Sequence, residues 1–551
     1  MAPRSHTVTN QAPPLVGYDV FTTDRVLTEA VDRHLPPDLR AEVREDLVVL
    51  GRAAGSAQVR EWGERADANP PRLRTHDRYG HRIDEVAFDP AWHRLLGKAV
   101  GAGLTDAWGR PGGHVRRAAG FLVASQPEAG HGCPVSMTHA SVPALRAEPE
   151  LAEVWVPAAT SHVYERELRP VAEKPGALLG MAMTEKQGGS DVRANTTEAR
   201  PLAADGEYVL TGHKWFCSAP MSDAFLVLAQ APAGLTCFLV PRVLADGSRN
   251  AFALMRLKDK LGNRSNASAE VEFDGTTWAR RVGEEGRGLA TIMGTVAATR
   301  VDCVLGSAAL MRQAVAQAVH HCTYREAFGG PLAEKPLMRN VLADLALESE
   351  AATVLGVRLA AAHDAADAEG GEAERERALL RIAVPAAKYW VTKRCTPVVA
   401  EALECLGGNG YVEESGMPRL LRESPVNSVW EGSGNVQALD VVRALRTEPA
   451  ALDALLREVG AARGADHRLD RAIRGLLVEL ADLDGIEARA RRLTERLALV
   501  LQGALLVRWA PPEVADAFCA ARLGGDGGAA FGTLPHTLDL RALVDRARVE
   551  V

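Results

Sequence analysis

Glu431 is the side chain in this sequence best placed to act as a base. It follows two apolar residues, Val429 and Trp430, and it precedes Gly432 and Ser433, which are small enough to let a ligand approach. An apolar neighbour raises the pKa of a carboxyl group toward the working range of a general base. A glutamate just before a helix is also commonly a capping or solvated group, so the pattern alone leaves both interpretations open.

A helix is expected to begin directly after this glutamate. Ser433 or Asn435 is expected near its N-cap. Apolar residues then recur at helical spacing, at Val436, Leu439, Val442 and Leu445. The sequence therefore places the carboxylate at the entrance to a helix.

The length and composition of the chain are those of a globular protein with several domains. The chain has 551 residues, and at about 150 residues per domain this predicts three or four domains. Hydrophobic residues make up 47% and charged residues 25%, which is ordinary. We expect an N-terminal arm and helical domain over 1–175, a central β domain over 176–285, a helical bundle over 286–446 and an extra helical region over 447–551.

The pattern of apolar residues underlies this division. The runs GEYVLTGHKWF, DAFLVLAQA and LTCFLVPR predict strands of the β domain, and SAEVEFDGTTW predicts a further strand and a turn. Long runs after residue 286 carry apolar residues three and four apart, which predicts an antiparallel bundle. Residues 118–126 are nearly all apolar, so we expect a buried helix there.

Cysteine usage and the N-terminal residues favour a cytoplasmic protein without a metal or a membrane span. The eight cysteines are scattered and form no C-x-x-C pair, which argues against a zinc site and against a disulfide framework. No apolar run approaches the ~20 residues of a membrane span, and MAPRSHTVTNQAPPL lacks the apolar core of a signal peptide. The net charge of -7 gives no whole-chain argument for binding nucleic acid.

An ordered set of motifs resembles the acyl-CoA dehydrogenase flavoprotein family, over roughly residues 80–446. The motifs are MTEKQGGSD from Met183, GHKWFCS from Gly212, REAFG from Arg325 on a bundle helix, LGGNGY from Leu406 and WEGS from Trp430. The resemblance implies an α+β, mainly α fold, with an N-terminal helical domain, a small central β-barrel and a C-terminal four-helix bundle, to which the extra C-terminal helical domain is added. It also implies FAD as cofactor, an acyl-CoA or related small molecule as substrate, and a homotetramer.

The resemblance also implies which residues contact the cofactor. They are Met183, Thr184, Gly189, Ser190, Phe216, Ser218, Arg325, Phe328, Trp430, Gly432, Ser433 and Asn435. Thr184 would serve the O2 edge of the flavin, Ser218 would lie near N5 and Phe216 would pack beside the ring, since reduction places charge at those edges. Ser190 suits a pyrophosphate oxygen, and Arg325 with Phe328 would reach the flavin of a neighbouring subunit. Thr184 and Ser218 as plain strand hydroxyls, and Arg325 as a solvated helix residue, remain the alternatives.

By the same resemblance Glu431 is the catalytic base. It would remove the α-proton of an acyl thioester while flavin N5 accepts the β-hydride. Thr299 stands where isovaleryl-type relatives carry an alternative base, which leaves Glu431. Arg443 is a candidate for a buried partner that orients the site, and a helix-end salt bridge is its alternative interpretation.

A closer resemblance is to the alkylation-response branch of the family. MTEKQGGSDVRANTT, KDKLGNRSNAS, PVNSVWEGSGN, the leading HTVTNQ and the region after residue 446 carry it. It implies a flavoprotein of the adaptive response to DNA alkylation that binds double-stranded DNA and retains weak dehydrogenase chemistry.

Support for DNA binding within the chain itself is limited. Residues 448–551 contain 14 Arg, no Lys and 16 acidic residues, whereas DNA affinity needs a concentrated basic face. The candidate face consists of arginines at helical spacing, Arg471, Arg474, Arg489, Arg492 and Arg496. A solvated, salt-bridged face is the alternative. A working acyl-CoA dehydrogenase or related flavin oxidase without a DNA role, and a purely structural flavin-bound oligomer, are the competing functions.

Overall fold

The computed structural model describes residues 5–550. The first four residues of the expected N-terminal arm, and residue 551, lie outside the described residues. The chain forms two compact units. A barrel unit comprises Gln58–Gly113 and Pro127–Asp302, and a bundle unit comprises Met1–Ala57, His114–Gln126 and Cys303–Val551. The predicted boundaries of four domains remain a prediction.

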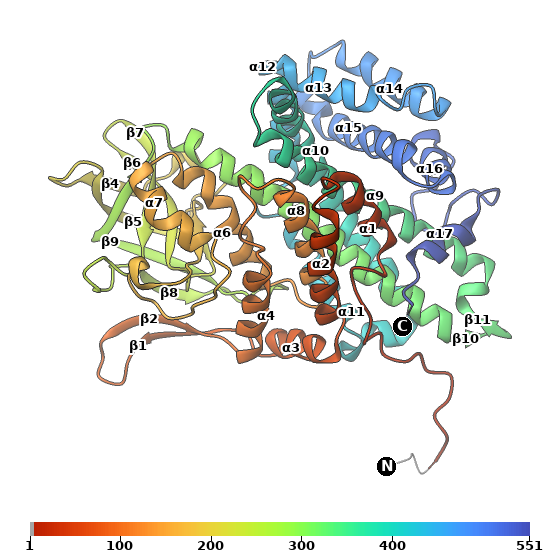
Figure 1. Ribbon diagram of the computed structural model, residues 1–551, viewed down its shortest axis with the longest axis horizontal. Coiled ribbons are helices and arrows are strands. Elements are labelled where there is room, and N and C mark those ends of the chain that lie inside the picture. Colours follow the sequence, from red (N-terminus) through yellow and green to blue (C-terminus); the bar gives the residue numbers. More distant parts are fainter. Residues whose placement is uncertain (1–4, 551) are drawn as a thin grey trace. The chain divides into compact units, whose positions relative to one another are not determined.

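The barrel unit is built on a closed sheet (Figure 1). Its strands are β3 (Leu179–Ala182), β4 (Glu198–Pro201), β5 (Glu207–Ser218), β6 (Ala224–Ala231), β7 (Gly234–Pro241), β8 (Ala253–Leu257) and β9 (Ser268–Val282). The ring runs β6–β4–β5–β9–β7 and closes because β7 pairs again with β6. Parallel β3 pairs with β6 on the side of this ring, and β8 pairs with β9. The small β-barrel expected from the sequence is confirmed.

Strand β6 shows why the barrel is stable. Phe225 and Val227 point into the barrel, where Phe238 and Phe273 also pack. Leu226 and its alternate neighbours point outward instead, into a second apolar cluster that includes residues of α6 (Gly132–Leu145) and α7 (Pro149–Ala159). Figure 1 shows α6 and α7 beside these strands. Both faces of β6 are thus buried, so its sequence reads as one continuous apolar run instead of an alternating one.

The remaining elements of the barrel unit precede the sheet. They are α3 (Ala57–Ala68), the hairpin of β1 (Arg72–His76) and β2 (Arg82–Ala87), and α4 (Pro90–Gly101). Arg82 donates to the carbonyl of Leu254 on β8 at 3.1 Å, which ties the hairpin to the barrel.

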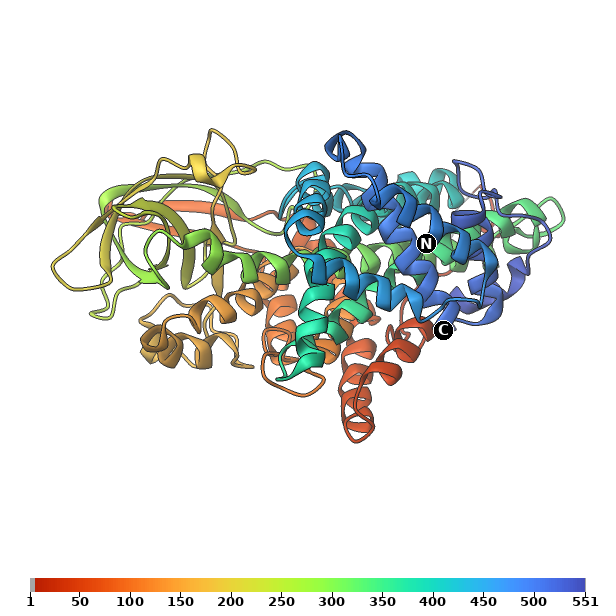
Figure 2. The same cartoon turned by 90° about the horizontal axis from the view of Figure 1, so that it is seen from above.

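The bundle unit is helical. It contains α1 (Arg25–His34), α2 (Arg40–Ala54), α5 (Gly113–Ser125), α9 (Pro336–Ala366), α10 (Gly371–Cys405), α11 (Met417–Glu423), α12 (Gly434–Thr447), α13 (Pro449–Gly460), α14 (His467–Leu480), α15 (Ile486–Trp509), α16 (Pro512–Phe518) and α17 (Leu540–Ala547). The C-terminal helices run alongside the bundle helices, as Figure 2 shows in blue against green and cyan. The buried helix predicted over 118–126 corresponds to α5.

Helix α8 (Gly288–Tyr324) continues from the barrel unit into the bundle unit. It packs closely on the bundle, because the Sγ of Cys395 on α10 lies 3.5 Å from the carbonyl of Ser307. Among the described residues it is the one helix whose length and hydropathy would let it cross a membrane, and 67% of that apolar window is buried inside the structure. This burial is typical of the core helix of a globular protein.

Helix α9 binds the C-terminal region through buried charges. Arg522 contacts Asp344 and lies 3.0 Å from Glu348. Arg546 of α17 lies 3.0 Å from Glu350. A third group of buried charges is centred on Arg358 of α9, which lies 2.9 Å from Glu376 and 3.0 Å from Glu458 of α13. Because buried carboxylates require such partners, these pairs fix the extra helices to the bundle.

Candidate active site

In the barrel unit, Thr184 lies against the strand that carries two other candidates. The backbone N–H of Trp215 donates to the Thr184 carbonyl at 2.8 Å. Phe216 and Ser218 follow on the same strand, β5. The backbone of half-buried Thr184 is thereby held against the strand that carries both candidates, although 30 residues or more separate them in sequence.

A β-bulge determines which way those side chains point. Lys214 pairs with Val271 and Cys217 pairs with Ala269, so Trp215 and Phe216 together oppose one residue of β9. The extra residue reverses the alternation of the strand, so that Cys217 is buried and Phe216 is 49% exposed. Since alternate residues share a face, Phe216 and Ser218 lie on the side opposite Cys217. The Ser218 hydroxyl lies 3.4 Å from that of Ser268.

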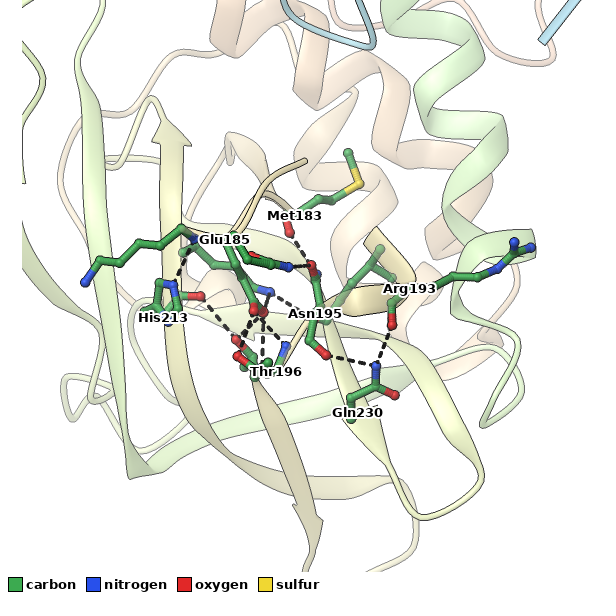
Figure 3. A network of polar contacts seen from close by, with 12 residues as sticks. Met183, Glu185, Arg193, Asn195, Thr196, His213 and Gln230 are labelled. Atoms are coloured by element: carbon green, nitrogen blue, oxygen red, sulfur yellow. Dashed lines mark hydrogen bonds and ion pairs between the residues drawn. The ribbon is translucent and has the colours of Figure 1, made fainter. Parts of the chain in front are cut away.

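The loop after Thr184 is anchored by Glu185, whose side chain points into the barrel (Figure 3). Its carboxylate accepts from the Lys214 ammonium at 2.7 Å, from the Thr197 hydroxyl at 2.6 Å and from the Thr196 N–H at 2.7 Å. Burial alone would raise the pKa of Glu185, but these donors, Lys214 above all, hold it below its ordinary value. The carboxylate is therefore ionised and fixed.

Asn195 closes the same loop. Its Nδ2 donates to the Met183 carbonyl at 2.9 Å, and its own carbonyl accepts from Gln230 at 3.0 Å, as Figure 3 shows. His213 accepts from the Lys186 N–H at 3.0 Å. The two ends of the loop are thus held together.

The segment between those ends is exposed and has the chemistry of an anion site. Gly188, Gly189 and Ser190 are all exposed. A Cβ at Gly189 would lie 2.4 Å from the Thr184 Oγ1, so only glycine allows this close approach. Small residues with accessible N–H groups and a serine hydroxyl are suited to phosphate oxygens. These residues fit the pyrophosphate of a dinucleotide cofactor.

In the bundle unit, Glu431 has a strained backbone. Its φ is 57° and that of Gly432 is 94°, and a non-glycine residue at positive φ is held there only by its surroundings. Helix α12 starts at Gly434 with Ser433 in the N-cap position, as predicted. Glu431 is therefore not the N-cap residue, and its side chain is half-buried.

Two buried side chains hold this loop. Lys388 of α10 donates to the Trp430 carbonyl at 2.7 Å and to the Gly432 carbonyl at 2.5 Å. Gln437 of α12 donates to the carbonyls of Glu431 and Gly432, each at 2.9 Å. The carbonyls on both sides of Glu431, and its own, are all engaged.

The other candidates in this segment are more exposed. The Trp430 indole donates to Asn427 at 3.1 Å, while Ser433 and Asn435 are exposed. Arg443 is exposed on α12, so the burial expected of it is not found in the single chain, and its role in orienting the site remains a prediction. The helical spacing was read correctly, but position 443 falls on the outer face of the helix.

Arg325 and Phe328 lie at a small hairpin. Arg325 comes just after the end of α8 and not on it, and its guanidinium donates to the carbonyl of Asn10. The hairpin of β10 (Glu326–Ala327) and β11 (Gly330–Pro331) follows. Phe328 at its tip is 93% exposed with a φ of 52°. The ring is therefore available for a contact with a partner.

The arginines proposed for DNA are partly engaged. Arg492 and Arg496 pair with Glu479 at 3.2 Å and 2.7 Å. Arg489 donates to the carbonyl of Asp482 at 2.6 Å. Arg471 and Arg474 are exposed on α14. The three candidate arginines on α15 are therefore held by contacts within the chain, as expected for a solvated, salt-bridged helix face.

The sequence analysis did not identify the two lysines that fix the loop after Thr184 and the loop around Glu431. Lys388 is the single charge within the apolar run IAVPAAKYWV, and Lys214 is the single charge in the middle of a strand. A charge in such a place requires a buried partner. That signal was available, but the sequence does not say which group is the partner.

Comparison with known proteins assigns the family. Models of the AidB N-terminal domain, the acyl-CoA dehydrogenase middle domain and the acyl-CoA dehydrogenase C-terminal domain match residues 10–166, 180–276 and 286–446. The AidB protein of Escherichia coli K12 is 46% identical over 95% of this chain and 96% of its own length. The chain belongs to the acyl-CoA dehydrogenase family, in its AidB-like branch.

Further acyl-CoA dehydrogenases of this kind support the assignment. Acyl-CoA dehydrogenase family member 11 of Caenorhabditis elegans is 29% identical over 89% of this chain and 84% of its own length. The crystal structure of C. elegans ACDH-11 in complex with C11-CoA superposes with a TM-score of 0.84 at 27% identity, covering 94% of each chain. Homologues in the acyl-CoA dehydrogenase family are flavoproteins. The expected fold is confirmed, and the roles of the individual site residues remain predictions.

Proposed function

We propose that this protein is an FAD-dependent oxidoreductase of the acyl-CoA dehydrogenase type, with Glu431 as the base that removes the α-proton of an acyl thioester. The observation that carries the proposal is the backbone of Glu431, held at a φ of 57° with its neighbouring carbonyls engaged. Strain of this kind persists where the structure over-determines it, and such residues gather at active sites. A solvated glutamate without a function would not require a backbone held at positive φ.

The barrel unit supplies the groups that suit FAD. The exposed Gly188–Ser190 segment offers N–H and hydroxyl donors for the pyrophosphate, and Thr184 with Ser218 offers hydroxyls for the polar edge of the ring. The exposed ring of Phe216 offers an apolar surface for packing. FAD held by these residues would supply the acceptor for the hydride from the β-carbon, and Glu431 would hold the proton taken from the α-carbon.

Anaerobic mixing with acyl-CoA thioesters tests this function. The panel includes C11-CoA, because the ACDH-11 structure contains it. We expect a thioester to bleach the oxidised flavin band and Glu431→Gln to abolish the bleaching, because an amide cannot accept the α-proton. Purified protein that contains no flavin after expression with ample riboflavin would contradict the proposal, and so would bleaching unchanged in Glu431→Gln.

We further propose that the protein assembles as a homotetramer in which Arg325 and Phe328 approach the flavin of a neighbouring subunit. The 93% exposure of Phe328 at the hairpin tip leaves its ring available for a contact of this kind. Light scattering on a sizing column measures the mass. A monomer at micromolar concentration would contradict the assembly.

A role in the adaptive response to DNA alkylation, with binding of double-stranded DNA in the cytoplasm, is a second proposal. The 46% identity with AidB and the match to the AidB N-terminal domain support it. The exposed pair on α14 is its best candidate contact, so Arg471→Ala with Arg474→Ala should weaken duplex binding in fluorescence anisotropy and reduce its salt dependence. Absence of binding to a duplex at low salt would exclude the DNA-binding role.

The cytoplasmic location is a separate claim, which cell fractionation tests.

A further inference from the structure

Lys388 is a fully buried lysine in the middle of α10. An apolar residue of the same length would fill this position without the cost of removing an ammonium group from water. Helix packing therefore does not explain its presence. Its two acceptors named above are the carbonyls of Trp430 and Gly432, which are the residues directly before and after Glu431.

We propose that Lys388 is a positioning residue for the base, a role that rests on the proposed function of Glu431. An ammonium group carries three N–H donors. By donating to the carbonyls on either side of Glu431, it fixes both flanking peptide groups and, with them, the direction in which the glutamate side chain leaves the backbone. Without this clamp, a residue at positive φ relaxes toward the ordinary regions of backbone space.

Gln437 completes the clamp from the opposite side of the loop. It is fully buried and holds the carbonyls of Glu431 and Gly432. A Cβ at Gly432 would lie 2.8 Å from its Nε2, so the loop and Gln437 are in tight contact. The loop is thus held by α10 and α12 together, and the arrangement allows one backbone conformation for the base.

Lys393 provides a matched control on the same helix. Its ammonium lies 5.5 Å from the centre of the Tyr389 ring and close to Gly434, the first residue of α12. Lys393→Met removes a positive charge near the same loop without removing either carbonyl contact, whereas Lys388→Met removes both. A difference between the two variants therefore reports the hydrogen bonds and not the loss of charge.

The primary readout is hydrogen exchange of the 429–433 amides in the protein without added substrate. We expect Lys388→Met to speed their exchange by about tenfold or more, and Lys393→Met to leave it within about twofold of the parent. The second readout is flavin bleaching by an active thioester. Lys388→Met should lower the limiting rate by about ten- to a hundredfold while the apparent Kd for the thioester stays within about twofold, because the base is misplaced and the binding groups are not.

The outcomes separate this inference from the proposed function. Unchanged exchange and an unchanged limiting rate in Lys388→Met would overturn the positioning role, even if Glu431→Gln abolishes bleaching. Bleaching at the parental rate in Glu431→Gln would overturn the proposed base, and with it the inference that depends on it. Should Lys388→Met fail to fold, Gln437→Met removes the donors from the opposite side, and the same exchange and rate changes are expected.

Discussion

Replacing Lys214 by methionine should destabilise the barrel unit strongly. The Lys214 ammonium and the Glu185 carboxylate are both fully buried and lie 2.7 Å apart. Methionine has a similar length and no charge, so the variant keeps most of the packing and leaves the carboxylate without its ion partner. Breaking a buried pair in this way costs about 3–5 kcal/mol of the free energy of unfolding.

The remaining hydrogen bonds place the expected cost toward the lower end of that range. Glu185 keeps the donors of Thr196 and Thr197, at 2.6–3.1 Å. Hydrogen bonds to a charged group contribute roughly 1.5–3 kcal/mol each, so the carboxylate stays partly compensated. We therefore expect a loss of about 3 kcal/mol at neutral pH.

The pH dependence of this loss has a definite sign. In the parent, Glu185 has a pKa below its unfolded value, so it contributes stability above the unfolded pKa and loses it as the pH falls through the folded pKa. Loss of Lys214 moves the folded pKa upward, because burial then dominates. The difference between variant and parent is consequently full at pH 7, because burial lowers the pKa of Lys214 only to about 8, and it shrinks below about pH 5, where the variant carboxyl takes up a proton.

Urea unfolding at pH 7 and pH 4, followed by tryptophan fluorescence, measures the effect. Lys186→Met is the matched control, because this exposed lysine is in the same loop and should change stability by about 0.5 kcal/mol at most. The double variant Glu185→Gln with Lys214→Met should lose less than Lys214→Met alone, since no buried charge remains. If the single variant costs no more than the control, or if its deficit grows toward acid pH, the reasoning is refuted.

Three further substitutions test other parts of the structure. Gly432→Ala places a Cβ 2.8 Å from Gln437 at a φ of 94°, so we expect a loss of about 1–3 kcal/mol in thermal unfolding together with faster exchange of the base loop. Arg546→Met leaves the Glu350 carboxylate buried without its arginine, which should destabilise the docking of α17 by about 3 kcal/mol and expose the C-terminus to limited proteolysis. Phe328→Ser removes an exposed ring. It should weaken self-association in sedimentation velocity while the midpoint of urea unfolding at low concentration stays unchanged.

Much of the fold could be predicted from local patterns. The continuous apolar run of β6 and the helical periodicity after residue 286 predicted a β domain and a helical bundle, because burial on one or two faces leaves a direct mark on the sequence, whereas the closed barrel was implied by the family resemblance. The run SAEVEFDGTTW predicts a strand and a turn, yet β9 continues through the whole run, and the strand register shifts between Asp274 and Thr277 instead. Glycine permits both a turn and a bulge, and only the partner strand decides between them.

The start of α12 was predictable from the sequence, but the contacts that hold the loop before it were not. Glu431 and Ser433 follow from the motif and the start of α12. The positive φ of Glu431 and the outward turn of Phe216 depend on contacts with α10 and β9, which are far away in the sequence. Arg443 is a second example of this limit. Helical spacing predicted the helix correctly, but it did not predict which face of the helix is covered.

The carboxylates of α9 have a consequence for how this chain could be shortened. Asp344, Glu348 and Glu350 are buried, and each pairs with an arginine that lies beyond residue 520, although Glu348 also pairs with Arg394 of α10 at 3.0 Å. A protein ending at residue 446 would retain these acids and lose those countercharges, so it should be insoluble or poorly folded. The C-terminal extension is thus an integral part of the bundle and not a detachable accessory.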